Sequence, residues 1–226
     1  MLKLYIANKN YSSWSLRPWL LLKQLEIPFA ESLVPFGSQP FASFSPTGRV
    51  PCLIDGPLTM WDSLAITEYL AESWPRVWPE DKVARAWARC ASAEMHSGFQ
   101  RIRDTCSMNC GIRVRLASQP AALIAEWQRI DTLWNEGLRR FGGPFLAGAR
   151  FSAADAFFAP VAFRVQTYSP QLSAPATAYA QTLLALPPMQ AWYASALAET
   201  WRDEPHEAEA RQEGEWLQDF RAPAVA

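Results

Sequence analysis

The chain has 226 residues, of which 50% are hydrophobic and 19% charged, and its net charge is -1. This length and apolar content are enough for one large or two small domains with a substantial core, which excludes a mainly disordered chain. Because acidic and basic residues nearly balance, the sequence shows no electrostatic footprint for nucleic acid or for an anionic membrane, and we expect neither as a partner.

Cysteine usage and the start of the chain indicate a reducing compartment. The four cysteines are irregularly spaced and do not resemble a secreted disulfide framework: Cys52, Cys90, Cys106 and Cys110. Residues 1–14 lack the apolar core of a secretory signal, and every longer apolar run is interrupted by charges, so we predict no membrane span. We therefore expect a cytoplasmic protein. Cys106 and Cys110 with only two histidines in the chain do not support a metal site, and none is predicted.

The first elements of the chain predict strand, helix, strand. Residues 2–6 alternate between apolar and other side chains, as a strand with one buried face does. Ser15 is the expected N-cap of a helix with Pro18 in its first turn, and apolar residues recur at helical spacing as far as Leu25. Residues 29–34 predict a second strand, and the Ser-, Pro- and Gly-rich stretch 36–48 predicts an irregular, exposed segment.

A hairpin and a helix follow. Residues 51–54 and 58–61 are short apolar runs separated by Asp55-Gly56-Pro57, which is turn chemistry, and they predict two antiparallel strands. Residues 63–73 have helical periodicity and end before Pro75. The predicted order is β-α-β followed by β-β-α.

After Pro79 the periodicity becomes helical, with few strand signals. Six stretches predict helices: 81–114, 120–140, 152–168, 174–186, 188–200 and the charged 204–215. The change in character predicts a mixed α/β domain at 1–76, a linker at 77–81 and an all-helical domain at 82–226.

Four local features, in this order, resemble the cytosolic glutathione S-transferase superfamily. They are the loop Tyr11-Ser12-Ser13-Trp14-Ser15-Leu16-Arg17, then Arg49-Val50-Pro51, Asp62-Ser63 and Ser152-Ala153-Ala154-Asp155. Each feature is weak alone, but together they cover essentially the whole chain and are similar to the serine-type zeta class and related bacterial enzymes. The resemblance implies a thioredoxin-like glutathione-binding domain followed by a helical bundle that holds the second substrate. It also implies a homodimer, glutathione as cosubstrate and a role in detoxification.

The first motif implies how a thiol would be activated. A glutathione thiol with an ordinary pKa near ~8.5 is mostly protonated at neutral pH, whereas its nucleophilic form is the thiolate. A serine hydroxyl at a helix N-terminus can donate a hydrogen bond to the sulfur while the helix dipole favours negative charge. By resemblance this serine is Ser12, with Ser13 the neighbouring candidate; the alternative is that both serines only cap the helix or satisfy the loop.

The second and third motifs imply the glutathione site. Val50-Pro51 resembles the cis-proline element of thioredoxin folds, which leaves the main chain before the proline free to pair with the tripeptide; the alternative is an ordinary strand start. Arg49 could reach a carboxylate of glutathione or could lie in solvent. Asp62-Ser63 matches both ends of the γ-glutamyl group, because aspartate accepts from its ammonium while helix amides and a serine hydroxyl bind its carboxylate. A plain capping aspartate is the alternative.

Four residues are expected to contact the second substrate. Trp14 stands where zeta-class enzymes carry a cysteine, which weighs against their cis-trans isomerase activity, and it could help to wall the site. His96, Phe99 and Arg103 share one face of the predicted helix 81–114, which could face the cleft, although a core or dimer-facing stripe is the alternative.

The function implied is a glutathione transferase whose thiolate attacks a small apolar electrophile. The alternative is a glutathione-binding regulatory or ligand-carrier protein of the same fold with little turnover. Conjugation, peroxide reduction and isomerisation stay open as reaction types, and the sequence does not identify the electrophile.

Overall fold

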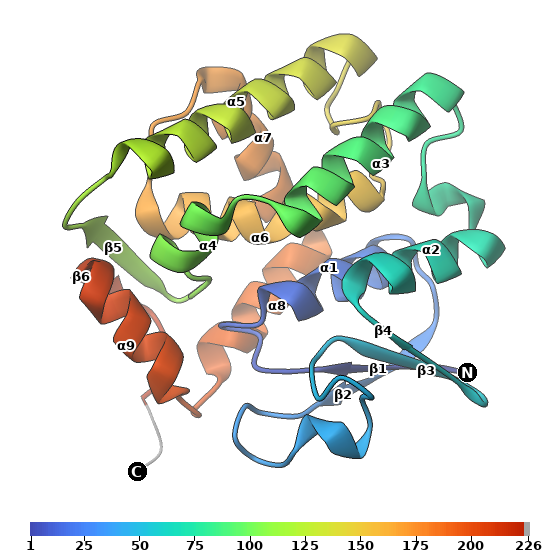
Figure 1. The fold of residues 1–226 in the computed structure, drawn as a ribbon, viewed down its shortest axis with the longest axis horizontal. Helices are drawn as coiled ribbons and strands as arrows, with labels where there is room; N and C mark the ends of the chain where they lie inside the picture. The colour runs from blue at the N-terminus through green and yellow to red at the C-terminus, as the bar shows by residue number, and fades with distance from the viewer. Residues whose placement is uncertain (224–226) are drawn as a thin grey trace.

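The first part of the chain is a four-stranded mixed sheet with two helices, and the computed structural model describes residues 1–223 (Figure 1). Its elements are β1 (Leu2–Ile6), α1 (Ser13–Gln24), β2 (Phe29–Leu33), η1 (Phe41–Ser43), β3 (Cys52–Asp55), β4 (Leu58–Trp61) and α2 (Ser63–Ser73). The strand order is β2-β1-β3-β4, with β1 and β2 parallel and the other neighbours antiparallel. The predicted order of elements is confirmed.

Helix α1 begins earlier than the sequence predicts. Its N-cap is Ser12 and not Ser15, because the carbonyl of Ser12 already accepts the first helical hydrogen bond, from the amide of Leu16 at 3.2 Å. Pro18 consequently lies inside the helix and not in its first turn. Ser15 is fully buried, and its hydroxyl accepts from the amide of Ala7 at 3.3 Å, which ties the helix to the end of β1.

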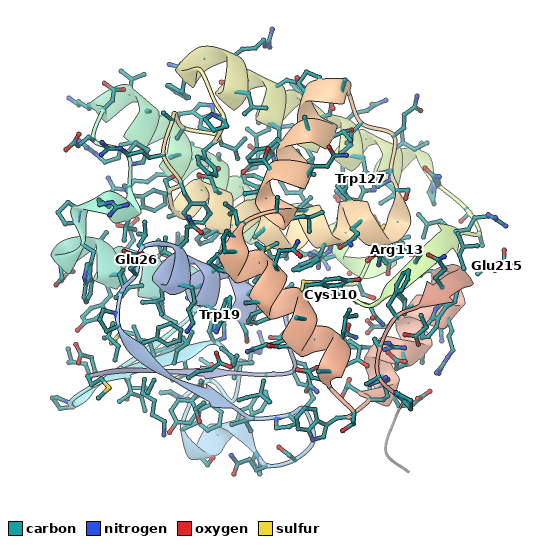
Figure 2. All side chains as sticks on the ribbon, turned by 180° about the vertical axis from the view of Figure 1, so that it is seen from behind. Trp19, Glu26, Cys110, Arg113, Trp127 and Glu215 are labelled. Atoms are coloured by element: carbon teal, nitrogen blue, oxygen red, sulfur yellow. The ribbon has the colours of Figure 1, made fainter. Side chains whose placement is uncertain are left out.

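The second part of the chain is mainly helical and packs over α1 and α2 (Figure 1). After the short turn η2 (Pro75–Val77) come α3 (Lys82–Ser97), α4 (Gln100–Thr105), β5 (Ile112–Leu116), α5 (Ala121–Phe141), α6 (Ala153–Tyr168), α7 (Ala174–Leu184), α8 (Pro187–Ala198), α9 (Glu204–Glu213) and β6 (Gly214–Asp219). Helix α6 is buried along nearly its whole length and contacts α1, α3 and α7. Trp19 of α1, which Figure 2 labels, meets Trp192 of α8 edge to face. Their ring centroids are 4.9 Å apart.

The prediction of one helix over 81–114 is wrong. Helix α3 is capped by Gly98, and Phe99 adopts a left-handed conformation with φ 59° before α4 starts. A Cβ on Gly98 would lie 2.9 Å from the carbonyl oxygen of Glu94, so the chain turns where only a glycine fits. Apolar periodicity continues through the break, which is why the sequence shows one helix and not two.

The predicted helical character of the second region is confirmed, and the region also contains two short strands that the sequence does not predict. β5 pairs antiparallel with β6, and Arg113 and Glu215 mark the two strands in Figure 2. The predicted charged helix 204–215 accordingly ends at Glu213. These strands are about a hundred residues apart in the chain, and a pairing over that separation leaves no local signal.

The N-terminus of α6 has the predicted capping box. The Asp155 carboxylate accepts from the amide of Ser152 at 2.9 Å, from the amide of Leu146 at 3.0 Å and from the Tyr179 hydroxyl at 2.9 Å. Burial raises the pKa of this carboxyl. The box therefore fixes the start of α6 against both the preceding loop and α7.

The segment between the two parts of the chain runs through η2 to Asp81, whose carboxylate accepts from the amide of Ala84 at 2.8 Å and caps α3. We propose the domain boundary here, with domains at 1–76 and 82–226 and the linker at 77–81. None of the helices within residues 1–223 is long and apolar enough to cross a membrane.

Candidate active site

The loop between β1 and α1 is held in place by the second region. The main-chain amide of Lys9 donates to the Glu199 carboxylate at 2.6 Å, and the Asn10 side chain donates to that of Asn109 at 2.8 Å. The Tyr11 hydroxyl donates to Glu207 of α9 at 2.8 Å. Contacts from residues far along the sequence thus fix the position of the residues that follow, Ser12 and Ser13.

Ser12 and Ser13 both line a cavity of about 510 Å³. The Ser12 hydroxyl donates to Ser15 Oγ at 2.7 Å and makes no capping bond to the helix, so its side chain does not serve as the N-cap acceptor. Ser13 is the first residue of α1. Each of these two serines is less than a tenth exposed, and both lie where the amides of the α1 N-terminus raise the electrostatic potential.

The Val50-Pro51 peptide bond is cis, as the resemblance implies. It lies directly before β3, and both residues line a second cavity of about 680 Å³ together with the exposed Arg49. The cis bond therefore lies at the border of this cavity.

Asp62 and Ser63 lie at the start of α2, on the same cavity. Asp62 has φ 74°, a left-handed backbone that a non-glycine residue rarely adopts, and its Oδ1 accepts from the amide of Leu64 at 2.8 Å. The Ser63 hydroxyl is buried and has no hydrogen-bond partner within residues 1–223. A strained cap beside an unpaired buried hydroxyl is typical of a binding site.

His96, at the end of α3, faces the same carboxylate. Its Nε2 lies 3.4 Å from Asp62 Oδ2, and its side chain lines the 680 Å³ cavity. Burial lowers the pKa of His96, an effect that Arg17 and Arg103 reinforce and that Asp62 opposes. His96 is accordingly uncharged at neutral pH, and Asp62 can accept from another cation.

Trp14, Arg49 and Val50 line both cavities, so the two spaces meet along these three residues. The Trp14 ring lies 4.1 Å from the guanidinium carbon of Arg17 and 4.7 Å from that of Arg103, both distances measured to the ring centroid. Cation–π contacts of this kind stabilise a ring position by about 0.5–2 kcal/mol. Trp14 therefore lies where the two cavities meet, with its ring held between Arg17 and Arg103.

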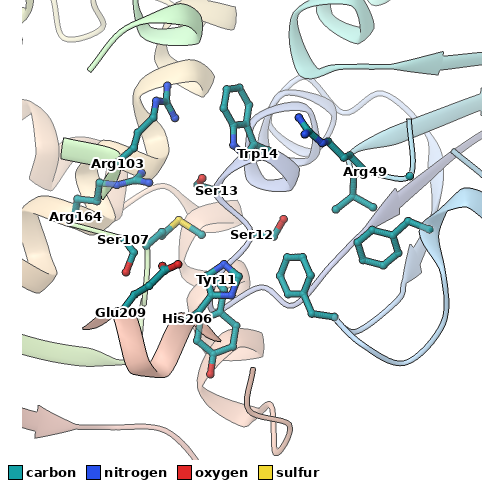
Figure 3. Close-up of a pocket in the computed structure, with 15 residues that line it drawn as sticks. Tyr11, Ser12, Ser13, Trp14, Arg49, Arg103, Ser107, Arg164, His206 and Glu209 are labelled. Atoms are coloured by element: carbon teal, nitrogen blue, oxygen red, sulfur yellow. The ribbon is translucent and has the colours of Figure 1, made fainter. Parts of the chain in front are cut away.

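The structure brings together all but one of the residues predicted for the site. Arg103 lines the 510 Å³ cavity from α4 (Figure 3), whereas Phe99 is buried in the core and lines neither cavity. His96, Phe99 and Arg103 do not share one helical face, because the break at Gly98 separates the first from the other two.

Several residues of the 510 Å³ cavity were missed by the sequence analysis. They are Phe36, Phe41, Ser107, Met108, Arg164, His206 and Glu209. His206 stacks between Tyr11 and Phe36, each at 5.1 Å between ring centroids, and its Nδ1 lies 2.5 Å from Asp203 Oδ2. His206 and Glu209 come from α9, and Figure 3 shows them beside Tyr11 on the side of the pocket away from Trp14. Only the three-dimensional fold brings this helix to the site.

Among residues 1–223, no group of three or more His, Cys, Asp or Glu side chains is placed to hold a metal ion. All four cysteines are free, and Cys52, Cys106 and Cys110 are buried. Burial raises the pKa of Cys106 to about 12, so this thiol stays protonated and packs as a small apolar group.

Comparison with protein families gives two matches. Residues 11–73 match the family model described as glutathione S-transferase, N-terminal domain, and residues 117–195 match the C-terminal domain of the same name. The first match contains the Ser12, Val50 and Asp62 motifs, and the second contains the capping box of α6.

Individual relatives agree with the family models. The chain is 27% identical over 207 residues to the glutathione S-transferase-like protein OpS6 of Beauveria bassiana, covering 86% of this chain and 89% of that protein. It is 29% identical over 179 residues to the maleylacetoacetate isomerase of Rattus norvegicus, covering 75% and 81%. A glutathione transferase homologue from Burkholderia, solved with bound glutathione, has the same fold with a TM-score of 0.68 at 23% identity, covering 86% of this chain and 97% of that structure.

Proposed function

This chain belongs to the glutathione S-transferase family, and we propose that it binds glutathione in the 680 Å³ cavity and activates its thiol at Ser12 for attack on a small electrophile in the 510 Å³ cavity. The observation that carries this proposal is the junction of the two cavities at Trp14, Arg49 and Val50. A tripeptide that lies along the cis-proline segment has its sulfur at this junction, with the second substrate on the other side.

The 680 Å³ cavity has side chains that complement the charged groups of glutathione. The Asp62 carboxylate can accept from the γ-glutamyl ammonium, because the neighbouring His96 is uncharged at neutral pH. The buried Ser63 hydroxyl, which has no partner in the described part of the chain, can donate to the γ-glutamyl carboxylate. Arg49 lines the same cavity and supplies positive charge for a carboxylate of the tripeptide.

Thiol activation at Ser12 needs only a rotation of its hydroxyl. In the absence of a thiolate this hydroxyl donates to Ser15 Oγ. When it turns to the sulfur, Ser15 Oγ still accepts from the amide of Ala7, so no buried acceptor is left unpaired. Lowering the thiol pKa by ~2 units takes roughly 2.7 kcal/mol, which a charge-assisted hydrogen bond and a helix N-terminus can supply together.

The test is the pH dependence of turnover in serine variants, with a generic aryl halide as electrophile. We expect Ser12→Ala to reduce kcat/KM at neutral pH about 100-fold and to raise the pKa of bound glutathione by ~2 units, as read from the ultraviolet absorbance of the thiolate. Ser13→Ala shows whether the neighbouring hydroxyl shares the role, and Ser97→Ala, on the exposed end of α3, is the matched control. Full activity of Ser12→Ala would exclude its assigned role.

A binding protein with little turnover is the other outcome of this test. Glutathione binding by calorimetry, without conjugation, peroxide reduction or isomerisation across a broad panel of substrates, would favour a regulatory or ligand-carrier function. The retained serine, cis-proline and Asp62-Ser63 elements support the catalytic proposal.

We also propose a cytoplasmic homodimer with a role in detoxification, as the family resemblance implies. The four free cysteines fit a reducing compartment. Leu58 and Trp61 on β4 are 51% and 44% exposed, and we assign this pair of large apolar side chains on one strand to the contact with a second copy. Sedimentation velocity tests the dimer: Leu58→Glu should shift it toward monomer, and a wild-type chain that sediments as a monomer would refute it.

A further inference from the structure

Three arginines from three different helices gather beside the 510 Å³ cavity. They are Arg17 of α1, Arg103 of α4 and Arg164 of α6, and the first two contact the ring of Trp14. Burial, together with the nearby charge of Arg164, lowers the pKa of Arg103 to about 10, although Glu126 and Asp104 oppose this shift. Burial likewise lowers the pKa of Arg17, and Arg103 and Arg164 add to this effect. Arg17 and Arg103 contact the same ring, and Arg103 and Arg164 line the same cavity, so the three guanidinium groups lie near one another.

No carboxylate within residues 1–223 forms a salt bridge with any of these three arginines, whereas the buried Lys9 and Arg221 are each paired. Arg103 donates to the main-chain carbonyls of Gly98, at 3.0 Å, and of Met95. Such bonds hold the side chain in place but do not neutralise its charge. Buried charges are ordinarily paired, because an unpaired one is costly to remove from water.

Arg164 is held in the same manner. Its Nε donates to the carbonyl of Cys106 at 2.7 Å and its Nη1 to that of Pro160 at 3.3 Å. Arg17 is 1% exposed, and in the described structure all three of its side-chain nitrogens are buried without a partner. The three arginines thus carry a positive charge that Asp62, Asp104 and Glu126 offset only in part and from a distance, since none of these carboxylates forms a salt bridge with them.

Two of these arginines face the cavity with donors to spare. Arg103 and Arg164 both line it, and Figure 3 shows them on the same side of the pocket, across from Arg49. Arg103 Nη1 and Arg164 Nη2 make no hydrogen bond to residues 1–223. The one acidic residue among the lining side chains, Glu209, is exposed, so water and salt screen its charge.

We propose that the electrophile taken by this site carries a carboxylate, which Arg103 and Arg164 bind while its apolar body lies against Phe36, Phe41 and Met108. The two free nitrogens, one from each arginine, match the two oxygens of a carboxylate. Arg17 adds electrostatic attraction from behind Trp14. This inference rests on the proposed function and narrows its second substrate from a small electrophile to one that has both an apolar body and a carboxylate.

The probe is a pair of aryl chlorides, 4-chloro-3,5-dinitrobenzoate and its neutral amide. In both, the glutathione sulfur attacks the chlorine-bearing carbon, so that a C–S bond forms and the C–Cl bond breaks. Chloride leaves with the bonding electrons, and the thiol proton passes to water. Each kcat/KM is divided by the rate constant of the uncatalysed reaction with glutathione, which removes the difference in intrinsic reactivity between the two compounds.

We expect the wild-type protein to prefer the carboxylate by about tenfold or more, the effect of one charge-assisted contact. Arg103→Met should remove most of that preference, and Arg164→Lys, which keeps the charge but loses the planar fork, should reduce it partly. The matched control is Arg85→Met, because Arg85 also donates to two main-chain carbonyls, of Pro79 and Glu80, but does not line the cavity. This control should keep the wild-type preference.

The inference would be overturned if the wild-type protein gave the same kcat/KM for the two compounds after division by the uncatalysed rate constants. The inference would also be overturned if Arg103→Met lowered kcat/KM equally for both compounds and raised the KM for glutathione. That result would assign the arginines to a carboxylate of glutathione itself. Calorimetry with the unreactive 4-methyl-3,5-dinitrobenzoate and its amide keeps the test independent of turnover. Tenfold tighter binding of the acid by a protein without activity would refute the proposed function alone, whereas equal binding would refute the carboxylate site.

Discussion

Replacing Asp155 by alanine should cost the protein a large part of its stability. Four buried donors lose their acceptor: the amides of Leu146 and Ser152 and the hydroxyls of Tyr179 and Ser152, at 3.0, 2.9, 2.9 and 3.2 Å. An unsatisfied buried donor costs about 1–3 kcal/mol, so four of them cost roughly 4–12 kcal/mol. Burial raises the pKa of Asp155, which shows that its charge is itself costly to bury, and losing that cost offsets part of the damage. We expect the free energy of unfolding to fall by about 4 kcal/mol out of a typical total of about 5–15 kcal/mol.

The assay is urea unfolding at neutral pH, followed by circular dichroism and by tryptophan fluorescence. Asp81→Ala is the matched control, because Asp81 also caps a helix, accepting from the amide of Ala84 at 2.8 Å, but is exposed. That substitution should cost about 1 kcal/mol. Tyr179→Phe removes one of the four donors together with its need for a partner and should cost about 1 kcal/mol as well.

A loss below about 1.5 kcal/mol for Asp155→Ala, or a loss equal to that of Asp81→Ala, would contradict this reasoning. It would mean that water or a shift of the loop before α6 replaces the missing acceptor, and that the buried box is no more important than an exposed cap.

Four further predictions concern the site and the contacts that support it. Acid should raise the KM for glutathione in the wild-type protein, since protonated His96 pairs with Asp62 in place of the γ-glutamyl ammonium; His96→Asn should flatten the KM profile between about pH 5 and 7. Burial lowers the pKa of His96, so the folded protein binds a proton at this residue less readily than the unfolded chain does. The free energy of unfolding should therefore fall as the pH drops below about 6.5. His96→Asn should lack this decrease. Gly98→Ala should lower stability by about 1–3 kcal/mol in urea unfolding, since its Cβ would meet the carbonyl of Glu94 at 2.9 Å, and an unchanged midpoint would show that the α3–α4 turn adapts freely. Glu199→Ala leaves two loop amides without their acceptor and should cost about 2 kcal/mol and lower kcat, whereas a wild-type kcat would show that this anchor does not position the catalytic loop.

The sequence predicted most of the first domain because its signals are local. Alternation in residues 2–6, the turn at Asp55-Gly56-Pro57 and the period of α2 each lie within about ten residues of the element that they describe. The resemblance added what periodicity does not show, such as the cis bond before Pro51.

The rest depended on contacts between distant segments. The β5–β6 pairing has no local pattern, and the break at Gly98 looks in the sequence like a tolerated glycine within a long helix. Arg164 lies on a helix buried almost all round, so its sequence context predicts only burial. His206 reaches the cavity because α9 packs over the loop before α1. The sequence of α9 contains no signal that predicts this packing.

The placement of α9 separates the choice of electrophile from the binding of glutathione. His206 and Glu209 line the 510 Å³ cavity proposed for the electrophile, but neither lines the 680 Å³ cavity proposed for glutathione. We expect that α9 and β6 can be exchanged for the matching segment of another family member if the hydrogen bonds of Glu207 with Tyr11 and Arg221 are kept. The exchange would change which electrophiles bind, whereas glutathione binding would be unchanged. Substrate specificity can therefore evolve through changes in this one segment.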